Sequence, residues 1–241
     1  MQFRSSRLTA LFGASPETVS YAQLEALTLN PEAVENEELD YKRTYDAGDE
    51  ENDKLAVDIA TFANHRGGVI ILGMAEDGAT SRATKAMGVE LTDNIRRRIT
   101  STAAQRIFPT PQFDLRELPD PSHQGKTPHG LLLIIIPPSG NAPHAVAKPG
   151  KEVRLAYPRR HLSKKVWLSE SDVAAAYRRR FTAAADQQSR VAAVEADVVK
   201  AIHAAGTQNP PSPLLTLSLA SERPGDFEID RDLFHAFQHE S

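Results

Sequence analysis

The segments ENEELDYK (residues 35–42) and ATFANHRGGVIILGMAEDG (residues 60–78) carry the clearest structural signals in this chain. In the first segment Leu39 and Tyr41 alternate with charged residues, and this period of two predicts a half-buried strand with one charged face. The aliphatic run VIIL in the second segment is typical of a central strand. The sequence therefore predicts two strands, with carboxylates at or near the ends of both.

A helix is predicted between these two strands. Apolar residues recur every three or four positions from Glu50 to Asn64, which is the spacing of an amphipathic helix. Gly67 and Gly68 are expected to end this helix. Further along, the pattern predicts a helix over residues 92–107, strands over residues 112–118 and 130–136, and a strand over residues 152–157 that completes the sheet.

The two segments together resemble the motifs of the AlbA-like domain that Schlafen proteins share with many bacterial regulators. The first motif corresponds to Glu35–Lys42 and the second to Ala60–Gly78, with Thr61 where the family usually has alanine. The resemblance implies a single α+β domain with a mixed β-sheet flanked by helices. An alanine-rich sequence follows and predicts a helical arm behind this domain.

The resemblance also implies a metal site. Schlafen members with nuclease activity hold a divalent metal with two acids of the first motif and one of the second, and they cut tRNA or rRNA. Carried over residue by residue, Glu35 and Asp40 match the first two acids. Glu76 matches the third, with Asp77 left open as the alternative, and Lys42 would contact the scissile phosphate.

Mg²⁺ or Mn²⁺ would suit these carboxylates, because both metals prefer hard oxygen ligands. The family usually has glutamate where this chain has Asp40, and the shorter side chain would weaken such a site. A plain acidic surface is the alternative, since most acids in proteins are solvated. The sequence alone does not show that the three acids meet.

Charge is divided along the chain, although the formal net charge is only −4. Residues 32–58 hold eleven acids and three bases, whereas residues 148–165 hold seven bases and one acid. A basic face beside acids is what a protein that handles phosphodiesters needs, although a solvated charged face would look the same. The predicted contacts to nucleic acid are Lys148, Lys151, Arg154, Arg159, Arg160, Lys164 and Lys165, with Arg96 and Arg97 on the helix before them.

The sequence lacks the residues that several other kinds of functional site require. The chain has no cysteine, so it has no zinc knuckle, no thiol nucleophile and no disulfide, and it suits a reducing cytoplasm. The zinc element of the family's eukaryotic members is therefore not expected. No phosphate-binding G-x4-GK[ST] motif occurs, so no nucleotide cofactor is expected. We expect a cytoplasmic protein with no membrane partner, because neither a secretory leader nor a long apolar run is visible.

The sequence predicts five regions. They are a helical lead-in (residues 1–30), the AlbA-like domain (residues 31–168), a helical arm (residues 169–205), a linker (residues 206–213) and a short strand-helix unit (residues 214–241). In the arm, Ser169 or Ser171 is expected to cap a first helix, and Val191, Val194 and Val198 mark a second. We expect the arm to form the interface of a homodimer. A monomer whose helices fold back on their own sheet is the alternative.

Three functions are compatible with these features. The first is a metal-dependent endoribonuclease that acts on structured RNA such as tRNA. The second is a non-catalytic DNA-binding regulator that uses the same basic face and retains the acids for folding. The third is an oligomeric interaction protein, which would not depend on the basic residues.

Overall fold

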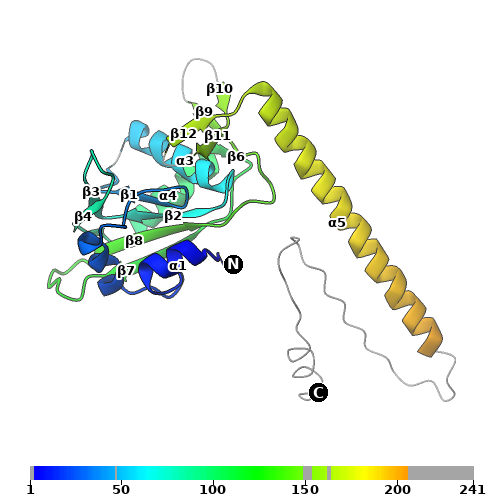
Figure 1. The fold of residues 1–241 in the computed structure, drawn as a ribbon, viewed down its shortest axis with the longest axis horizontal. Coiled ribbons are helices and arrows are strands. Elements are labelled where there is room, and N and C mark those ends of the chain that lie inside the picture. Colours follow the sequence, from blue (N-terminus) through cyan, green and yellow to red (C-terminus); the bar gives the residue numbers. More distant parts are fainter. Residues whose placement is uncertain (1–2, 47, 149–153, 162–163, 206–241) are drawn as a thin grey trace. The chain divides into compact units, whose positions relative to one another are not determined.

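The computed structural model of the protein describes residues 3–46, 48–148, 154–161 and 164–205 (Figure 1). The chain divides into two units, residues 1–177 and residues 178–241, and each is described by itself. We call the first unit the domain. The predicted linker and the predicted strand-helix unit lie outside the described residues, so the predicted division of the chain into five regions stays a prediction.

A mixed five-stranded sheet forms the centre of the domain. Its strands are β1 (Leu39–Lys42), β2 (Gly68–Leu72), β5 (Val89–Glu90), β7 (Asp114–Pro119) and β8 (His129–Ile136). Strand β1 pairs in parallel with β2, and helix α3 (Asp49–Ala63) joins them. Strands β2, β5 and β7 all pair antiparallel with β8. The predicted α+β fold with a mixed sheet is confirmed.

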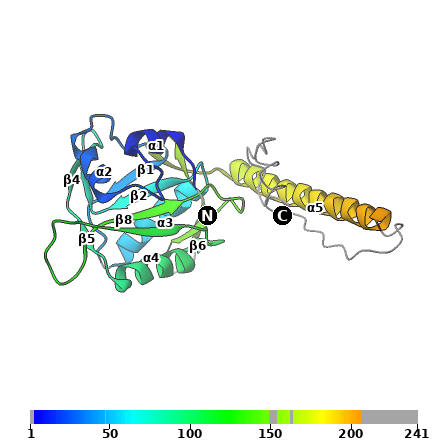
Figure 2. The same cartoon turned by 90° about the horizontal axis from the view of Figure 1, so that it is seen from below.

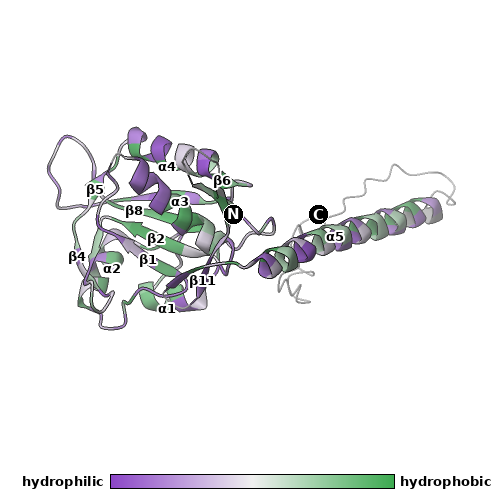
Figure 3. Ribbon diagram, turned by 90° about the horizontal axis from the view of Figure 1, so that it is seen from above, coloured by the Kyte–Doolittle hydropathy of each residue, from purple (hydrophilic) through white to green (hydrophobic). Residues whose placement is uncertain are grey.

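Helices cover both faces of this sheet (Figure 2). On one face, Leu39 and Val69 pack in a core with residues of the N-terminal helices α1 (Ser6–Phe12), α2 (Tyr21–Glu25) and η1 (Ala26–Leu29). On the other face, Ile70 and Leu72 pack against α3 and α4 (Asp93–Arg106). Successive side chains of β2 and β8 therefore enter different cores, which is why residues 69–72 and 131–136 are all aliphatic (Figure 3).

Three small sheets lie beside the central one. Strand β3 (Met74–Glu76) pairs with β4 (Ala83–Ala86), strand β9 (Ala145–Lys148) pairs with β6 (Ile107–Phe108) and β10 (Arg154–Ala156), and β11 (Pro158–His161) pairs with β12 (Lys164–Trp167). The prediction that a strand over residues 152–157 completes the central sheet was therefore wrong. Strand β8 is already paired on both sides, and side chains cap the free edge of β1.

The charged face of β1 also differs from the prediction. Alternation predicted that this face would meet solvent, yet Asp40 is only 3% exposed. Helix α3 contacts strand β11, and side chains from both elements reach Asp40 and its neighbour Lys42. A strand of alternating pattern can therefore be buried on both faces when its charges find partners.

Helix α5 (Glu170–Ala205) is continuous over 36 residues. Of the two caps predicted, Ser169 or Ser171, the structure has Ser169, because its hydroxyl accepts the backbone N–H of Asp172 at 3.3 Å. The two helices predicted for the arm are one helix, since residues 170–205 contain no glycine or proline to interrupt it. None of the helices described is long and apolar enough to cross a membrane.

Candidate functional site

Asp40 lies within β1 and binds two cations. Its Oδ1 lies 3.3 Å from Nη1 of Arg160, and its Oδ2 contacts Nζ of Lys42. Burial by itself would raise the pKa of Asp40, but the positive charges of Lys42, Lys165 and Arg160 hold that pKa below its usual value. Asp40 is therefore a buried, ionised carboxylate with both oxygens in ion pairs.

Asp58 of α3 extends this cluster. Its side chain is completely buried, with Oδ2 3.3 Å from Nζ of Lys42 and Oδ1 in contact with Nζ of Lys165 on β12. Burial raises the pKa of Asp58, and the nearby charge of Asp40 adds to this, while both lysines oppose it. We call Asp40, Asp58, Lys42, Arg160 and Lys165 the buried ion network. It connects β1, α3 and the β11–β12 hairpin.

Arg160 caps the free edge of β1. Its Nε donates to the carbonyl oxygen of Asn36 at 3.2 Å, and its Nη2 donates to that of Leu39 at 3.5 Å. The guanidinium also lies over the ring of Phe62, 5.2 Å from the ring centroid. With 2% of its surface exposed, Arg160 is not on the basic face, so its predicted contact to nucleic acid is corrected.

The pairing within the hairpin explains why the prediction failed for this residue. Arg160 faces Lys165 across the strands, and cross-strand partners share one face of a ribbon. That face points toward Asp40 and Asp58, so both cations are used inside the domain. Lys165 keeps 36% of its side-chain surface exposed, but its ammonium group pairs with Asp58.

Glu35 and Glu76 form a separate carboxyl pair. The Oε1 of Glu35 accepts the backbone N–H of Tyr41 at 2.7 Å, and the two carboxyl groups are hydrogen-bonded. Burial, followed by the charge of Asp40, raises the pKa of Glu35 to about 8. The same two causes raise the pKa of Glu76. The pair therefore holds a proton at neutral pH.

Asp77, the alternative third acid, lies in the turn between β3 and β4. Its Oδ1 accepts the backbone N–H groups of Ala79 and Thr80 and the hydroxyl of Thr80. These bonds to Thr80 hold the pKa of Asp77 below its ordinary value. The structure places Glu76, and not Asp77, beside Glu35.

The arrangement does not fit a metal centre of three carboxylates. Within the described ranges, no three histidine, aspartate or glutamate side chains meet in a group that could hold a metal ion. Asp40, the central member of the expected set, has a cation on each of its oxygens. Lys42, expected at the scissile phosphate, lies between Asp40 and Asp58.

The other face of the hairpin carries exposed cations. Arg159 and Val166 face each other across the strands, as do His161 and Lys164, and all four are exposed. Burial, followed by the positive charge of Arg159, lowers the pKa of His65. Arg66 follows His65 in the turn after α3; its side chain is 71% exposed, and its Nη1 lies 4.0 Å from Oε2 of Glu37. We call Arg66, Arg159, His161 and Lys164 the ribbon surface.

Five further basic residues were predicted to contact nucleic acid. Arg96 and Arg97 are exposed on α4, and Arg96 is ion-paired with Asp93 and Glu117. The structure describes only the backbone of Lys148 on β9 and Arg154 on β10, and Lys151 lies outside the described residues. Their predicted roles stay predictions.

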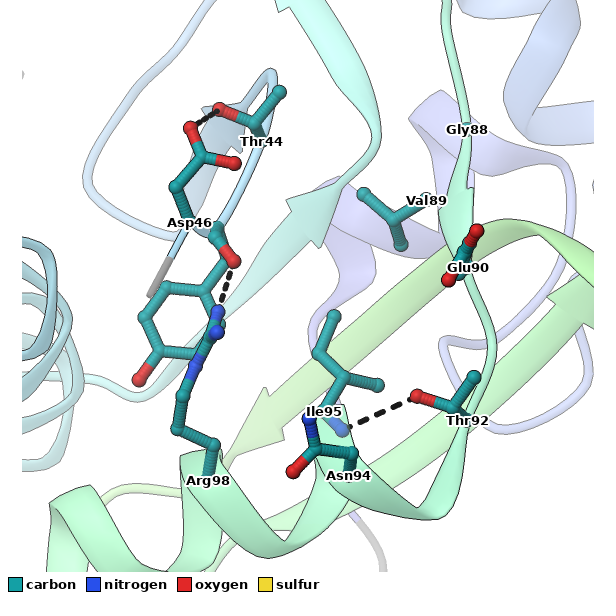
Figure 4. A pocket seen from close by; sticks show the side chains of 10 residues that line it. Thr44, Asp46, Gly88, Val89, Glu90, Thr92, Asn94, Ile95 and Arg98 are labelled. Atoms are coloured by element: carbon teal, nitrogen blue, oxygen red, sulfur yellow. Dashed lines mark hydrogen bonds between the residues drawn. The ribbon is translucent and has the colours of Figure 1, made fainter. Parts of the chain in front are cut away.

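A polar hollow lies near the N-terminus of α4 (Figure 4). It has a volume of about 330 Å³ and is lined by Thr44, Tyr45, Asp46, Gly88, Val89, Glu90, Thr92, Asn94, Ile95 and Arg98. The guanidinium of Arg98 stacks 3.8 Å from the centroid of the Tyr45 ring and donates to the Tyr45 carbonyl. The guanidinium of Arg98 is therefore already bound to Tyr45 within the domain. None of the acids discussed above lines this hollow.

Comparison with known families agrees with this fold and these motifs. A family model described as "Schlafen, AlbA_2" matches residues 35–166, which is more than half of the chain. The chain belongs to the Schlafen AlbA_2 family. Membership of this family indicates a function related to nucleic acids. The matched range of this Schlafen AlbA_2 chain extends from before β1 into β12 and includes the whole buried ion network.

The chain was also compared with curated proteins and with solved structures. No curated protein matches this Schlafen AlbA_2 chain. Among solved structures, it is similar to the DIP2311 protein from Corynebacterium diphtheriae, with 18% sequence identity and a TM-score of 0.35. The alignment covers 68% of this chain and 27% of that protein. The chain therefore spans about a quarter of the length of this solved relative.

Asp58 is the residue of the site that the sequence analysis missed. It belongs to the helix between the two motifs of this Schlafen AlbA_2 domain, where only apolar positions were singled out. A signal was present, because Asp58 lies three residues after Leu55 and four before Phe62, within the apolar stripe of that helix. An acid at such a position must find a buried partner or change its protonation.

Proposed function

We propose that this protein binds duplex DNA through the ribbon surface and does not cleave it. The observation that carries the proposal is the division of cations between the two faces of the β11–β12 hairpin. Arg160 and Lys165 face the acids of the domain, whereas Arg159, His161 and Lys164 face away from them. Ion pairs hold the inner face in place, and the outer face keeps cations for phosphate groups.

The shape of the hairpin favours duplex DNA over duplex RNA. The major groove of B-form DNA is about 12 Å wide and admits a two-stranded β-ribbon. The major groove of A-form RNA is deep and narrow, so a ribbon enters it poorly. The ribbon surface consists of arginine, lysine and histidine, which supports backbone contacts more than the reading of a particular base sequence.

The geometry around the acids supports binding without cleavage. An endoribonuclease of the kind expected from the family would need Asp40 as a metal ligand and Lys42 at the phosphate. Here both residues belong to the buried ion network, which stabilises the position of the hairpin. We therefore infer that the acidic motif is retained for folding, as in the regulator alternative.

The test measures binding and cleavage with the full chain. Fluorescence anisotropy with labelled duplex DNA, single-stranded DNA and duplex RNA of equal length compares the wild type with the double variant Arg159→Gln/Lys164→Gln. The control is Arg7→Gln/Lys85→Gln, which removes two exposed cations from α1 and β4. Gel lanes with Mg²⁺, Mn²⁺ or EDTA, and tRNA as a second substrate, detect cleavage.

We expect the ribbon variant to lose at least about tenfold in affinity for duplex DNA, because each lost phosphate contact weakens binding. The control should bind as the wild type does. Equal losses in both variants would refute the ribbon surface as the binding site. Metal-dependent cleavage of tRNA that disappears in Glu35→Gln would instead support the endoribonuclease.

A further inference from the structure

Helix α5 carries an apolar stripe beyond the domain. Ala184, Gln187, Val191, Val194 and Val198 follow one another at alternating spacings of three and four residues. This is the a/d pattern of a coiled coil, with Ala184, Val191 and Val198 at a and Gln187 and Val194 at d. We call these five residues the seam.

Large apolar side chains flank the seam and are exposed. Phe181 and Ile202 both occupy e positions, and they are 64% and 45% exposed. Together with the seam they extend the stripe over about three heptads, which is about 33 Å of helix at about 1.5 Å per residue. Hydrophobic and hydrophilic residues alternate along the whole of α5 (Figure 3). Such a stripe is typical of a helix that pairs with another helix.

The charges beside the seam select a second copy of the chain as the partner. Arg190 lies at g and Glu195 at e, both exposed. In a parallel, in-register pair each g residue faces the e residue five positions further along the other helix. Arg190 would therefore meet the partner's Glu195, and the two-fold axis would repeat this pair on the other side.

The polar residue of the seam supports the same orientation. In a parallel pair, Gln187 lies opposite the partner's Gln187, so their amide groups can bond to each other. In an antiparallel pair centred on the valines, Gln187 would lie opposite a valine and lose that bond.

We propose that residues 181–202 of α5 join two copies of this chain in a parallel coiled coil. This inference does not depend on the proposed binding of DNA, and it is tested without nucleic acid. Sedimentation velocity of the full chain over a wide range of concentration is expected to show a monomer–dimer equilibrium. Val194→Glu should raise the dissociation constant of the dimer at least about tenfold, because it places two like charges in one layer of the seam. Ala193→Glu, one position away at c, should leave it unchanged.

A charge exchange tests the partner and the orientation together. Arg190→Glu and Glu195→Arg should each weaken the dimer, and the double variant should recover part of the loss. Circular dichroism of each variant controls for lost helix, because Arg190 also bonds to Gln187 within α5 at 2.9 Å. No recovery in a helical double variant would refute the parallel register.

Cross-linking gives an independent measure of orientation, since the chain has no cysteine of its own. Val198→Cys should form a disulfide-linked dimer under mild oxidation, and Ala196→Cys, at the outer f position, should not. A dimer that does not cross-link at residue 198 would be antiparallel and would overturn the proposed arrangement. A chain that stays monomeric at every concentration, or that dimerises equally well with Val194→Glu, would overturn the proposal itself.

Discussion

Replacement of Arg160 by methionine should destabilise the domain strongly. The guanidinium ion-pairs with Asp40 and donates to the carbonyl oxygens of Asn36 and Leu39, and Arg160 is almost completely buried. Methionine keeps the apolar part of the side chain but removes all three interactions. Loss of one member of a buried ion pair typically costs about 3 to 5 kcal/mol, because the other charge stays buried with fewer partners. We expect Arg160→Met to lower the free energy of unfolding by about that amount.

Urea unfolding of the full chain measures this loss. Trp167 of β12 is the only tryptophan in the sequence, so its fluorescence follows the hairpin, while circular dichroism follows the helices. The control is Arg159→Met, one residue away on the exposed face, which should change the free energy of unfolding by less than about 0.5 kcal/mol.

A double-mutant cycle isolates the contact with Asp40. Arg160→Met combined with Asp40→Asn should destabilise the domain by at least about 1 kcal/mol less than the sum of the two single changes, because the residues interact directly. If Arg160→Met costs no more than Arg159→Met, or if the two changes are additive, the buried ion network does not stabilise the domain as described.

Three further predictions concern other parts of the domain. The pKa of Glu35 rises from 4.5 to about 8 in the folded chain, so folding takes up a proton between these values. The free energy of unfolding should therefore fall as pH rises from about 5 to 8. Glu35→Gln should reduce that fall by on the order of 1 kcal/mol, a figure that allows for the partial exposure of Glu35. Urea unfolding of both proteins at each pH measures the difference. Gly68→Ala would place a methyl group 2.4 Å from the Phe62 ring and should lower the free energy of unfolding by about 1 to 3 kcal/mol. Gly78→Ala is the control, because a methyl group there meets no atom within 4 Å. Thermal unfolding should show a much smaller loss for the control. Thr92→Ala removes the hydroxyl that accepts the Ile95 N–H at the start of α4. The loss of this helix cap should lower the free energy of unfolding by about 1 kcal/mol. A melting temperature equal to that of the wild type would contradict the capping role of Thr92.

Local patterns were sufficient to predict the central elements. The alternation in LDYK, the amphipathic spacing before Asn64 and the aliphatic run VIIL correspond to β1, α3 and β2. These signals depend on residues close together in the chain, so they can be recognised without knowing the tertiary structure. The same holds for the cap at Ser169.

The candidate site depends on residues far apart in the chain. Asp40 and Arg160 are separated by 120 positions, and nothing local in either segment shows that they meet. Seven bases between residues 148 and 165 predicted a basic surface, but the register of a short hairpin turns Arg160 and Lys165 inward. A change of one residue in that register would exchange the faces, so composition alone could not assign these side chains.

The salt dependence of DNA binding tests the central claim most directly. Anisotropy gives the affinity for duplex DNA at each salt concentration. In a plot of the logarithm of this affinity against the logarithm of the salt concentration, the slope reports the number of phosphate contacts. Arg159→Gln/Lys164→Gln should make this slope shallower by about 1.8, and Arg7→Gln/Lys85→Gln should leave it as in the wild type. An unchanged slope in the first variant, or equal changes in both, would contradict the assignment of the outer face of the hairpin to nucleic acid.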